Sequence, residues 1–284
     1  MRKKDEILKT DIAKIVTLFI VIGIIISNVM IFVPTSATTS FTVAPRIPLK
    51  NGSSTSLNWA GYADVVKSGS VYLVNASWIV PNVQPSKSST YVAVWVGIDV
   101  YNDSTVEQTG ILAESQHGTV SYSAWYEFYP SASVSAPKND IVQPGDLIVA
   151  WVQYSASTGT FTTVLKDVTE NWTFTSPATT VLGADRSSAE WIEWIVERPA
   201  IAGSLTTLAN FNVTDFGEYY TYVANTCYFN NSISIGSSNW ISITMVSNNG
   251  KTLASPSSLI NGNSFNVTYS SSSSSQSTPP HSHK

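Results

Sequence analysis

The sequence predicts an all-β protein, built as an antiparallel sandwich or barrel. Short runs of β-branched and aromatic residues recur between breaks rich in Gly, Pro, Asn and Ser, and helical periodicity is scarce. Aromatic residues make up 11% of the 284-residue chain and charged residues only 12%, which allows a large apolar core. A chain of this length could form one large β domain or two small ones, and we expect one.

The expected strands follow from these runs. Pro144-Gly145-Asp146 and Asn248-Asn249-Gly250 are typical of tight turns between strands. Examples of the runs themselves are Val71–Val80, Tyr91–Ile98, Val120–Tyr129, Leu147–Tyr154, Phe161–Leu165, Trp191–Val196 and Ile241–Val246.

Both ends of the chain differ in composition from this β-rich region. Residues 1–37 combine a Lys-rich start with an almost unbroken apolar run, Ile15–Val33, which indicates an export signal peptide or an N-terminal membrane anchor. In either case the remainder is expected outside the cell, secreted or anchored to the surface. We expect a linker or short propeptide at 38–54, the β domain at 55–269 and a disordered Ser/Pro-rich tail at 270–284. Asn-X-Ser/Thr sites that suit glycosylation occur at Asn51, Asn75, Asn102, Asn171, Asn212, Asn230 and Asn266.

The numbers of charged, cysteine and histidine residues exclude several classes of function. The formal net charge is −4 and no basic cluster occurs beyond Ala44, so we expect no nucleic-acid partner. Cys227 is the only cysteine, which rules out an intrachain disulfide. Two of the three histidines, His281 and His283, lie in the tail, and His117 is expected in a solvated turn. A Ser/His/Asp site and a three-His zinc site therefore lack residues, and we expect no metal and no cofactor.

Five short motifs occur in a fixed order: Asn58–Tyr62 (NWAGY), Trp95–Asp99 (WVGID), Gln108–Gly110 (QTG), Ala124–Pro130 (AWYEFYP) and Glu193–Pro199 (EWIVERP). In this order they resemble the glutamic peptidases, the eqolisin family, with weaker matching toward Tyr269. The resemblance implies a sandwich of two curved sheets, of the concanavalin A-like jelly-roll type. Its concave face would hold the substrate, and a catalytic Gln and Glu would project from neighbouring strands.

By the same resemblance, the family's catalytic Gln falls on Gln108 and its catalytic Glu on Glu197. Residues expected to line or support the site are Trp59, Trp95, Asp99, Glu127 and Glu193. Ionised Glu197 would deprotonate the attacking water and return the proton to the leaving nitrogen, while the Gln108 amide would hold the water and donate to the oxyanion. Because the amide needs no particular protonation state, such a pair suits acidic surroundings.

The glutamate assignment depends on a duplication in the sequence. Glu190-Trp191-Ile192 is followed directly by Glu193-Trp194-Ile195, and an insertion of three residues reverses side-chain parity along a strand. Anchoring the register on Glu197-Arg198-Pro199 makes Glu193 an inner partner on the same face and sends Glu190 to the opposite face.

The expected function is thus that of a secreted, acid-active endopeptidase that acts on polypeptides as a monomer. Pepsin-type chemistry is excluded because neither Asp-Thr-Gly nor Asp-Ser-Gly occurs. A glycosidase pair of Glu193 and Glu197 would be about 13 Å apart along a strand, which is too far for either glycosidase geometry. The alternative from another class is a carbohydrate-binding or adhesive surface module without catalysis, which the Trp and Tyr content also allows.

Overall fold

The structure is a computed structural model that describes residues 41, 55–65, 71–98, 105–181, 191–217, 226–229, 232–234, 241–260 and 264–270. All of these belong to the second of two compact units, Ser40–Lys284. The predicted signal or anchor, most of the predicted linker and tail, and two individual residues, Asp99 and Glu190, lie outside the described residues. Within the described part of the chain, no helix has the length and hydropathy needed to cross a membrane.

The predicted all-β class is confirmed, because the described residues form nineteen strands and no helix. The strands are β1 (Thr55–Ser56), β2 (Trp59–Val65), β3 (Val71–Ile79), β4 (Thr90–Ile98), β5 (Val106–Gln116), β6 (Thr119–Tyr129), β7 (Val134–Ser135), β8 (Leu147–Ser155), β9 (Thr160–Asp167), β10 (Trp172–Thr175), β11 (Trp191–Glu197), β12 (Ala200–Ile201), β13 (Ser204–Leu205), β14 (Val213–Phe216), β15 (Thr226–Phe229), β16 (Ser232–Ser234), β17 (Ile241–Val246), β18 (Thr252–Pro256) and β19 (Phe265–Tyr269).

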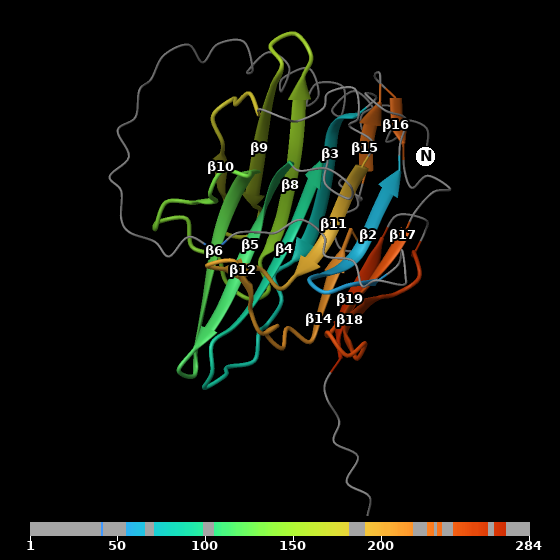
Figure 1. Cartoon of the computed structure of the whole chain (residues 1–284). Coiled ribbons are helices and arrows are strands. Elements are labelled where there is room, and N and C mark those ends of the chain that lie inside the picture. The colour runs from blue at the N-terminus through green and yellow to red at the C-terminus, as the bar shows by residue number, and fades with distance from the viewer. Residues whose placement is uncertain are drawn as a thin grey trace, which may run out of the picture. The chain divides into compact units, whose positions relative to one another are not determined.

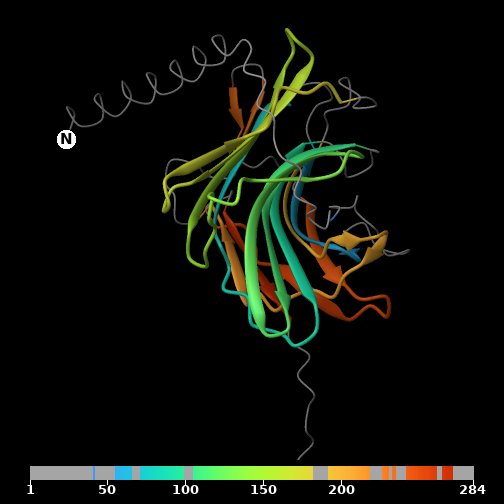
Figure 2. The same ribbon diagram turned by 90° about the vertical axis from the view of Figure 1, so that its left-hand side faces the viewer.

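The strands form two layers (Figure 1). One layer, here called the site sheet, has the order β17-β2-β11-β4-β5-β6-β7. The other, the back sheet, is built on β10-β9-β8-β3, with β14 and β15 both pairing with β3. β17 pairs with β2 of the site sheet and with β18 of the back sheet, so the layers are continuous at that edge. The long green strands β4 to β6 curve along their length, as Figure 2 shows.

Alternation along each strand decides which side chains fill the core. In β11, Ile192, Trp194 and Val196 belong to the main apolar cluster, which also contains residues of β3, β8 and β9 in the back sheet. Glu193, Ile195 and Glu197 therefore point to the other side of the site sheet, here called the site face. A second apolar cluster covers this face and includes Trp59, Trp95, Trp125 and Ile195.

The seven predicted strands correspond to β3, β4, β6, β8, β9, β11 and β17, and both predicted turns form, with positive φ at Gly145 and Gly250. His117 is exposed in the β5–β6 turn, as expected. β5 did not stand out in the sequence, because its VEQTGILAESQ carries Glu, Gln, Gly and Ser at positions that are nearly all buried. This strand nevertheless carries Gln108.

Candidate active site

Four polar or small residues line up across the middle of the site sheet. Cα pairing places Glu193 of β11 opposite Gly97 of β4, Gly97 opposite Gln108 of β5, and Gln108 opposite Glu127 of β6. We call these four residues the polar row. Glu193, Gln108 and Glu127 have no exposed surface. The sheet thus gathers on one face three polar side chains from sequence positions up to 85 residues apart.

The amide of Gln108 is oriented by Glu127. Gln108 Nε2 donates a hydrogen bond of 2.8 Å to Glu127 Oε2, which fixes which end of the amide faces the carboxylate. Gln108 Oε1 is buried and has no hydrogen-bond partner among the described residues. A buried amide oxygen of this kind is ready to accept a hydrogen bond from a water or a substrate group.

Gly97 separates Glu193 from Gln108. With neighbouring strands about 4.8 Å apart, the two backbones are about 10 Å apart, and only a glycine stands between them. The neighbouring indole uses that space: a Cβ built on Gly97 would lie 3.0 Å from Trp95 Cζ3 and 3.3 Å from Gln108 Cβ. Gly110 allows a close approach of the β4 backbone, since a Cβ there would meet the carbonyl oxygen of Val94 and lie 2.8 Å from Trp95 Cα. Gly97 thus allows the indole of Trp95 to lie beside the polar row.

Glu197 lies elsewhere on the same face. Its Cα is paired with Ala93, two pleats from the polar row, so its backbone is about 16 Å from that of Gln108. Its two oxygens accept hydrogen bonds from Trp95 Nε1 at 3.0 Å and from Asn58 Nδ2 at 3.3 Å. The structure therefore brings Glu193, and not Glu197, into line with Gln108. It also places β4 between β5 and β11, so the expected pair does not project from neighbouring strands.

Asn58 reaches Glu197 because of the turn between β1 and β2. Ser56 Oγ donates to Asn58 Oδ1 at 2.9 Å and accepts the backbone N–H of Trp59 at 3.1 Å. Trp59 in turn packs edge-on against Trp95, with ring centroids 5.0 Å apart and planes at 77°. Trp59 and Trp95 lie in the apolar cluster on the site face. Ser56 and Gly97 were not singled out from the sequence as site residues.

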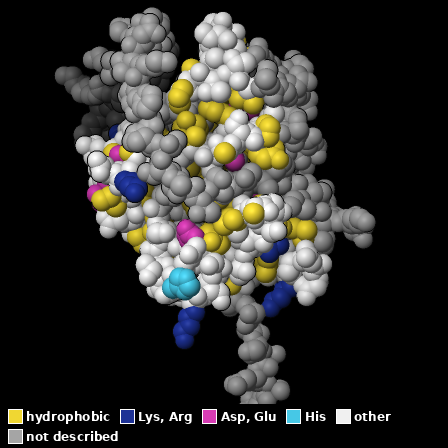
Figure 3. All heavy atoms as spheres, turned by 60° about the vertical axis from the view of Figure 1, so that its left-hand side comes forward, with side chains coloured by type: hydrophobic (Ala, Val, Ile, Leu, Met, Phe, Trp, Pro, Cys, Tyr) yellow, Lys and Arg dark blue, Asp and Glu magenta, His cyan; other side chains and the backbone are white. Residues whose placement is uncertain are grey.

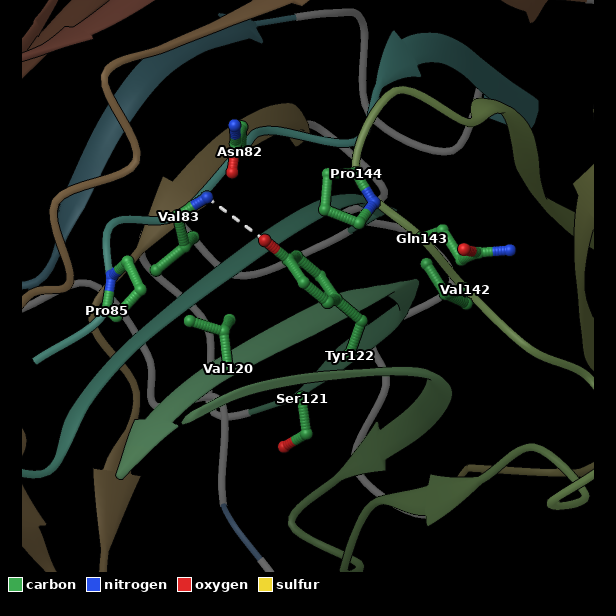
Figure 4. A pocket seen from close by; sticks show the side chains of 9 residues that line it. All are labelled: Asn82, Val83, Pro85, Val120, Ser121, Tyr122, Val142, Gln143 and Pro144. Carbon is green, nitrogen blue, oxygen red and sulfur yellow. Dashed lines mark hydrogen bonds between the residues drawn. The ribbon is translucent and has the colours of Figure 1, made fainter. Parts of the chain in front are cut away.

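A hollow of about 490 Å³ opens on the other face of β6, remote from the polar row. Figure 4 shows the Tyr122 ring in this hollow, with its hydroxyl accepting the N–H of Val83 at 3.0 Å. Since Tyr122 and Glu127 have opposite parity in β6, the hollow is separate from the site face. Among the described residues, no group of three or more His, Cys, Asp or Glu could hold a metal ion.

Comparison with known proteins identifies the family and the fold of this chain. The model of the peptidase A4 family matches residues 57–271. Among solved structures, scytalido-glutamic peptidase with a peptide-based transition-state analog is similar at 19% identity and a TM-score of 0.61, covering 75% of this chain and 98% of that chain. SCP-B, a member of the eqolisin family in a complex with the tripeptide Ala-Ile-His, is similar at 18% identity and a TM-score of 0.59, covering 75% of this chain and 98% of that chain.

Aspergilloglutamic peptidase from Aspergillus niger is similar at 23% identity and a TM-score of 0.52, covering 64% of this chain and 99% of that chain. At these identities the solved structures show a shared fold, and a comparison with curated proteins gives no match. The family match carries the classification, because it spans most of the chain and all five motifs. The chain belongs to the peptidase A4 family and is a peptidase of the glutamic type.

Proposed function

We propose that this chain is a secreted endopeptidase that hydrolyses peptide bonds in acid, with Gln108 and Glu193 as its catalytic pair. The observation that carries the proposal is the polar row, in which Glu193 of β11 and Gln108 of β5 are both paired with Gly97 of the strand between them, β4. The sequence had favoured Glu197 as the base. Its distance from Gln108 and its contacts with Trp95 and Asn58 support a positioning role instead.

In the proposed reaction Glu193 acts as general base and then as general acid. It takes a proton from a water held by Gln108 Oε1, and the resulting hydroxide attacks the carbonyl carbon of the substrate. The second hydrogen of Gln108 Nε2, which Glu127 does not take, is available to the oxyanion. Glu193 then returns the proton to the amide nitrogen, the C–N bond breaks, and an acid and an amine leave.

Two further parts of the proposal rest on the sequence. Activity in acid suits this pair, since Gln108 keeps its hydrogen-bonding groups at any pH and a single carboxylate must be ionised for attack. Secretion or surface anchoring rests on the apolar run Ile15–Val33 behind a Lys-rich start. Polypeptides are the expected substrates, and the chain is expected to act as a monomer.

The test compares Glu193→Gln with Glu197→Gln in hydrolysis of a denatured protein at about pH 3. Glu193→Gln keeps the shape but cannot accept the proton, so we expect a rate loss of about 10²–10⁴ with little change in melting temperature. Glu197→Gln keeps one acceptor oxygen, and we expect measurable activity. Loss of activity in Glu197→Gln with full activity in Glu193→Gln would show that the base is Glu197 and that the polar row is not the catalytic centre.

A further inference from the structure

The turn between β1 and β2 is fastened to the end of β11, where Glu197 lies. Arg198 donates its backbone N–H to the carbonyl oxygen of Asn58 at 3.0 Å and its Nε to the carbonyl oxygen of Leu57 at 2.7 Å. Asn58 Nδ2 donates to Glu197 Oε1 at 3.3 Å. Asn58 and Glu197 have no exposed surface. The turn thus brings a buried amide to the carboxyl group that holds the indole of Trp95.

The hydrogen bonds of Ser56 fix which end of the Asn58 amide faces Glu197. A serine hydroxyl has one hydrogen and two lone pairs. Ser56 Oγ accepts the backbone N–H groups of Trp59 at 3.1 Å and of Asn58 at 3.3 Å, and it donates to Asn58 Oδ1 at 2.9 Å. A flipped amide would place its NH₂ group against an oxygen whose lone pairs are already in use. Toward Glu197 the amide of Asn58 therefore presents an N–H group.

Glu197 receives a donor on each of its two oxygens. Trp95 Nε1, which lies 3.0 Å from Oε2, is a group that can only donate, and the Asn58 amide is held with its donor toward Oε1. A carboxylate accepts both bonds, whereas an amide at this position would turn its own NH₂ group toward one of the two donors. The direction of these bonds selects a carboxylate, and this carboxylate keeps the edge of the indole over Gly97 beside Gln108.

We propose that Asn58, oriented by Ser56, is a positioning residue for the reaction, because through Glu197 it fixes the indole of Trp95 beside the amide of Gln108. The proposal rests on the proposed function, in which Gln108 is one of the catalytic pair. A donor at position 58 and an acceptor at position 197 are required together. Exchanging the amide and the carboxylate between the two positions should therefore restore the arrangement.

The experiment measures kcat and KM for a peptide substrate in Asn58→Asp, Glu197→Gln and the double variant. The assay is run at about pH 5, where carboxyl groups of ordinary pKa are ionised. Asn58→Asp sets two carboxylates against each other, and we expect kcat to fall about tenfold or more with little change in KM. Glu197→Gln turns an NH₂ group toward a donor, and we expect a smaller loss of kcat. In the double variant the new amide donates to the new carboxylate and accepts from Trp95 Nε1, so most of the lost kcat should return.

The β17–β18 turn offers a matched control. Ser247 Oγ donates to Asn249 Oδ1 across the same spacing as in Ser56 and Asn58, but at an exposed site. Asn249→Asp should change neither kcat nor KM. Ser56→Ala removes the bond that orients the Asn58 amide without adding a charge. It should lower kcat partially, and it keeps the proposal testable if Asn58→Asp does not fold. Melting curves at the same pH report on folding in every variant.

A double variant that melts like the unaltered protein but has a kcat as low as that of Asn58→Asp would overturn the proposal. So would Asn58→Asp with a lowered melting temperature and an unchanged kcat, because the turn would then serve the fold alone. Glu193→Gln separates these failures from failure of the proposed function. Recovery in the double variant, together with full activity of Glu193→Gln, would keep the positioning role and refute the catalytic pair. No recovery, together with an inactive Glu193→Gln, would keep the pair and refute the positioning role.

Discussion

At Gly97 the lack of a side chain has a direct structural consequence. The edge of the Trp95 indole lies over Gly97, beside Gln108, in space that a side chain at this position would take. Glu197 holds that indole through its Nε1. Three residues of the family motifs thus have different tasks. Gly97 leaves room for the indole of Trp95, the indole lies beside the polar row, and Glu197 holds the indole in place by a hydrogen bond.

Gly97→Ala tests this division of tasks. The added methyl group would lie 3.0 Å from Trp95 Cζ3 and 3.3 Å from Gln108 Cβ, so the indole or the amide must shift by a few tenths of an ångström. We expect kcat to fall by about tenfold or more, since small misplacements of catalytic groups are costly, with only a modest change in melting temperature. Gly118→Ala, at a hairpin tip with nothing within 4 Å, should lower stability through its positive φ and leave kcat unchanged. An unchanged kcat in Gly97→Ala would contradict the need for a residue without a side chain at this position.

At the scale of elements, a pair of buried aspartates lies where β8 begins and β9 ends in the back sheet. Asp146, just before β8, and Asp167, at the end of β9, are 4% and 0% exposed. Each accepts a backbone N–H, from Gln143 at 2.6 Å and from Glu170 at 2.8 Å. Burial, together with the charge and hydrogen bond of Asp146, raises the pKa of Asp167 to about 6. The hydrogen bonds from the backbone N–H groups of Glu170 and Thr169 act in the opposite direction and lower this pKa.

This pair predicts a fold that is more stable in acid. Because the pKa of Asp167 is raised in the folded state, its contribution is fully present below about pH 3.8 and is lost as the pH rises through about 6. Asp167→Asn keeps the acceptor for Glu170 and removes the second charge. We expect it to raise the free energy of unfolding at pH 7 by an amount on the order of 1 kcal/mol, which corresponds to a rise in melting temperature of about 2–4 °C. At pH 3 we expect little effect.

Melting curves from pH 3 to pH 8 check this prediction. Asp215→Asn, a half-buried aspartate in β14 of the back sheet, is the control and should leave the difference between acid and neutral pH in place. An equal effect of Asp167→Asn at pH 3 and pH 7 would show that the pKa of Asp167 is not raised in the folded state.

The whole molecule presents few charged side chains to its surroundings. Figure 3 shows one face on which isolated charged groups are scattered among uncharged polar and apolar surface. With charged residues at 12% of the sequence, protonation of carboxylates in acid removes few favourable interactions and adds a modest net charge. The surface is therefore consistent with the proposed activity in acid.

The composition of the whole chain also predicts its response to inhibitors. With one cysteine, three histidines and no Asp-Thr-Gly or Asp-Ser-Gly, proteolysis by Gln108 and Glu193 should persist in the presence of thiol reagents, chelators and pepsin-class transition-state inhibitors. The measurement is the rate of hydrolysis of a denatured protein at about pH 3 with and without each compound. Abolition of the rate by any one of them, at unchanged melting temperature, would place the catalysis in another class.

The sequence by itself determined the all-β class and the family, because alternation along a strand and short motifs are local properties. It also placed Glu193 and Glu197 on one face, since residues four apart in a strand share a face. Which of the two lies opposite Gln108 was decided by the pairing of β11 with β4 and of β4 with β5. Such cross-strand register depends on contacts between distant segments and the packing of whole sheets, which no motif contains. The same holds for Asp146 beside Asp167, where burial and proximity arise only once the sheets have formed.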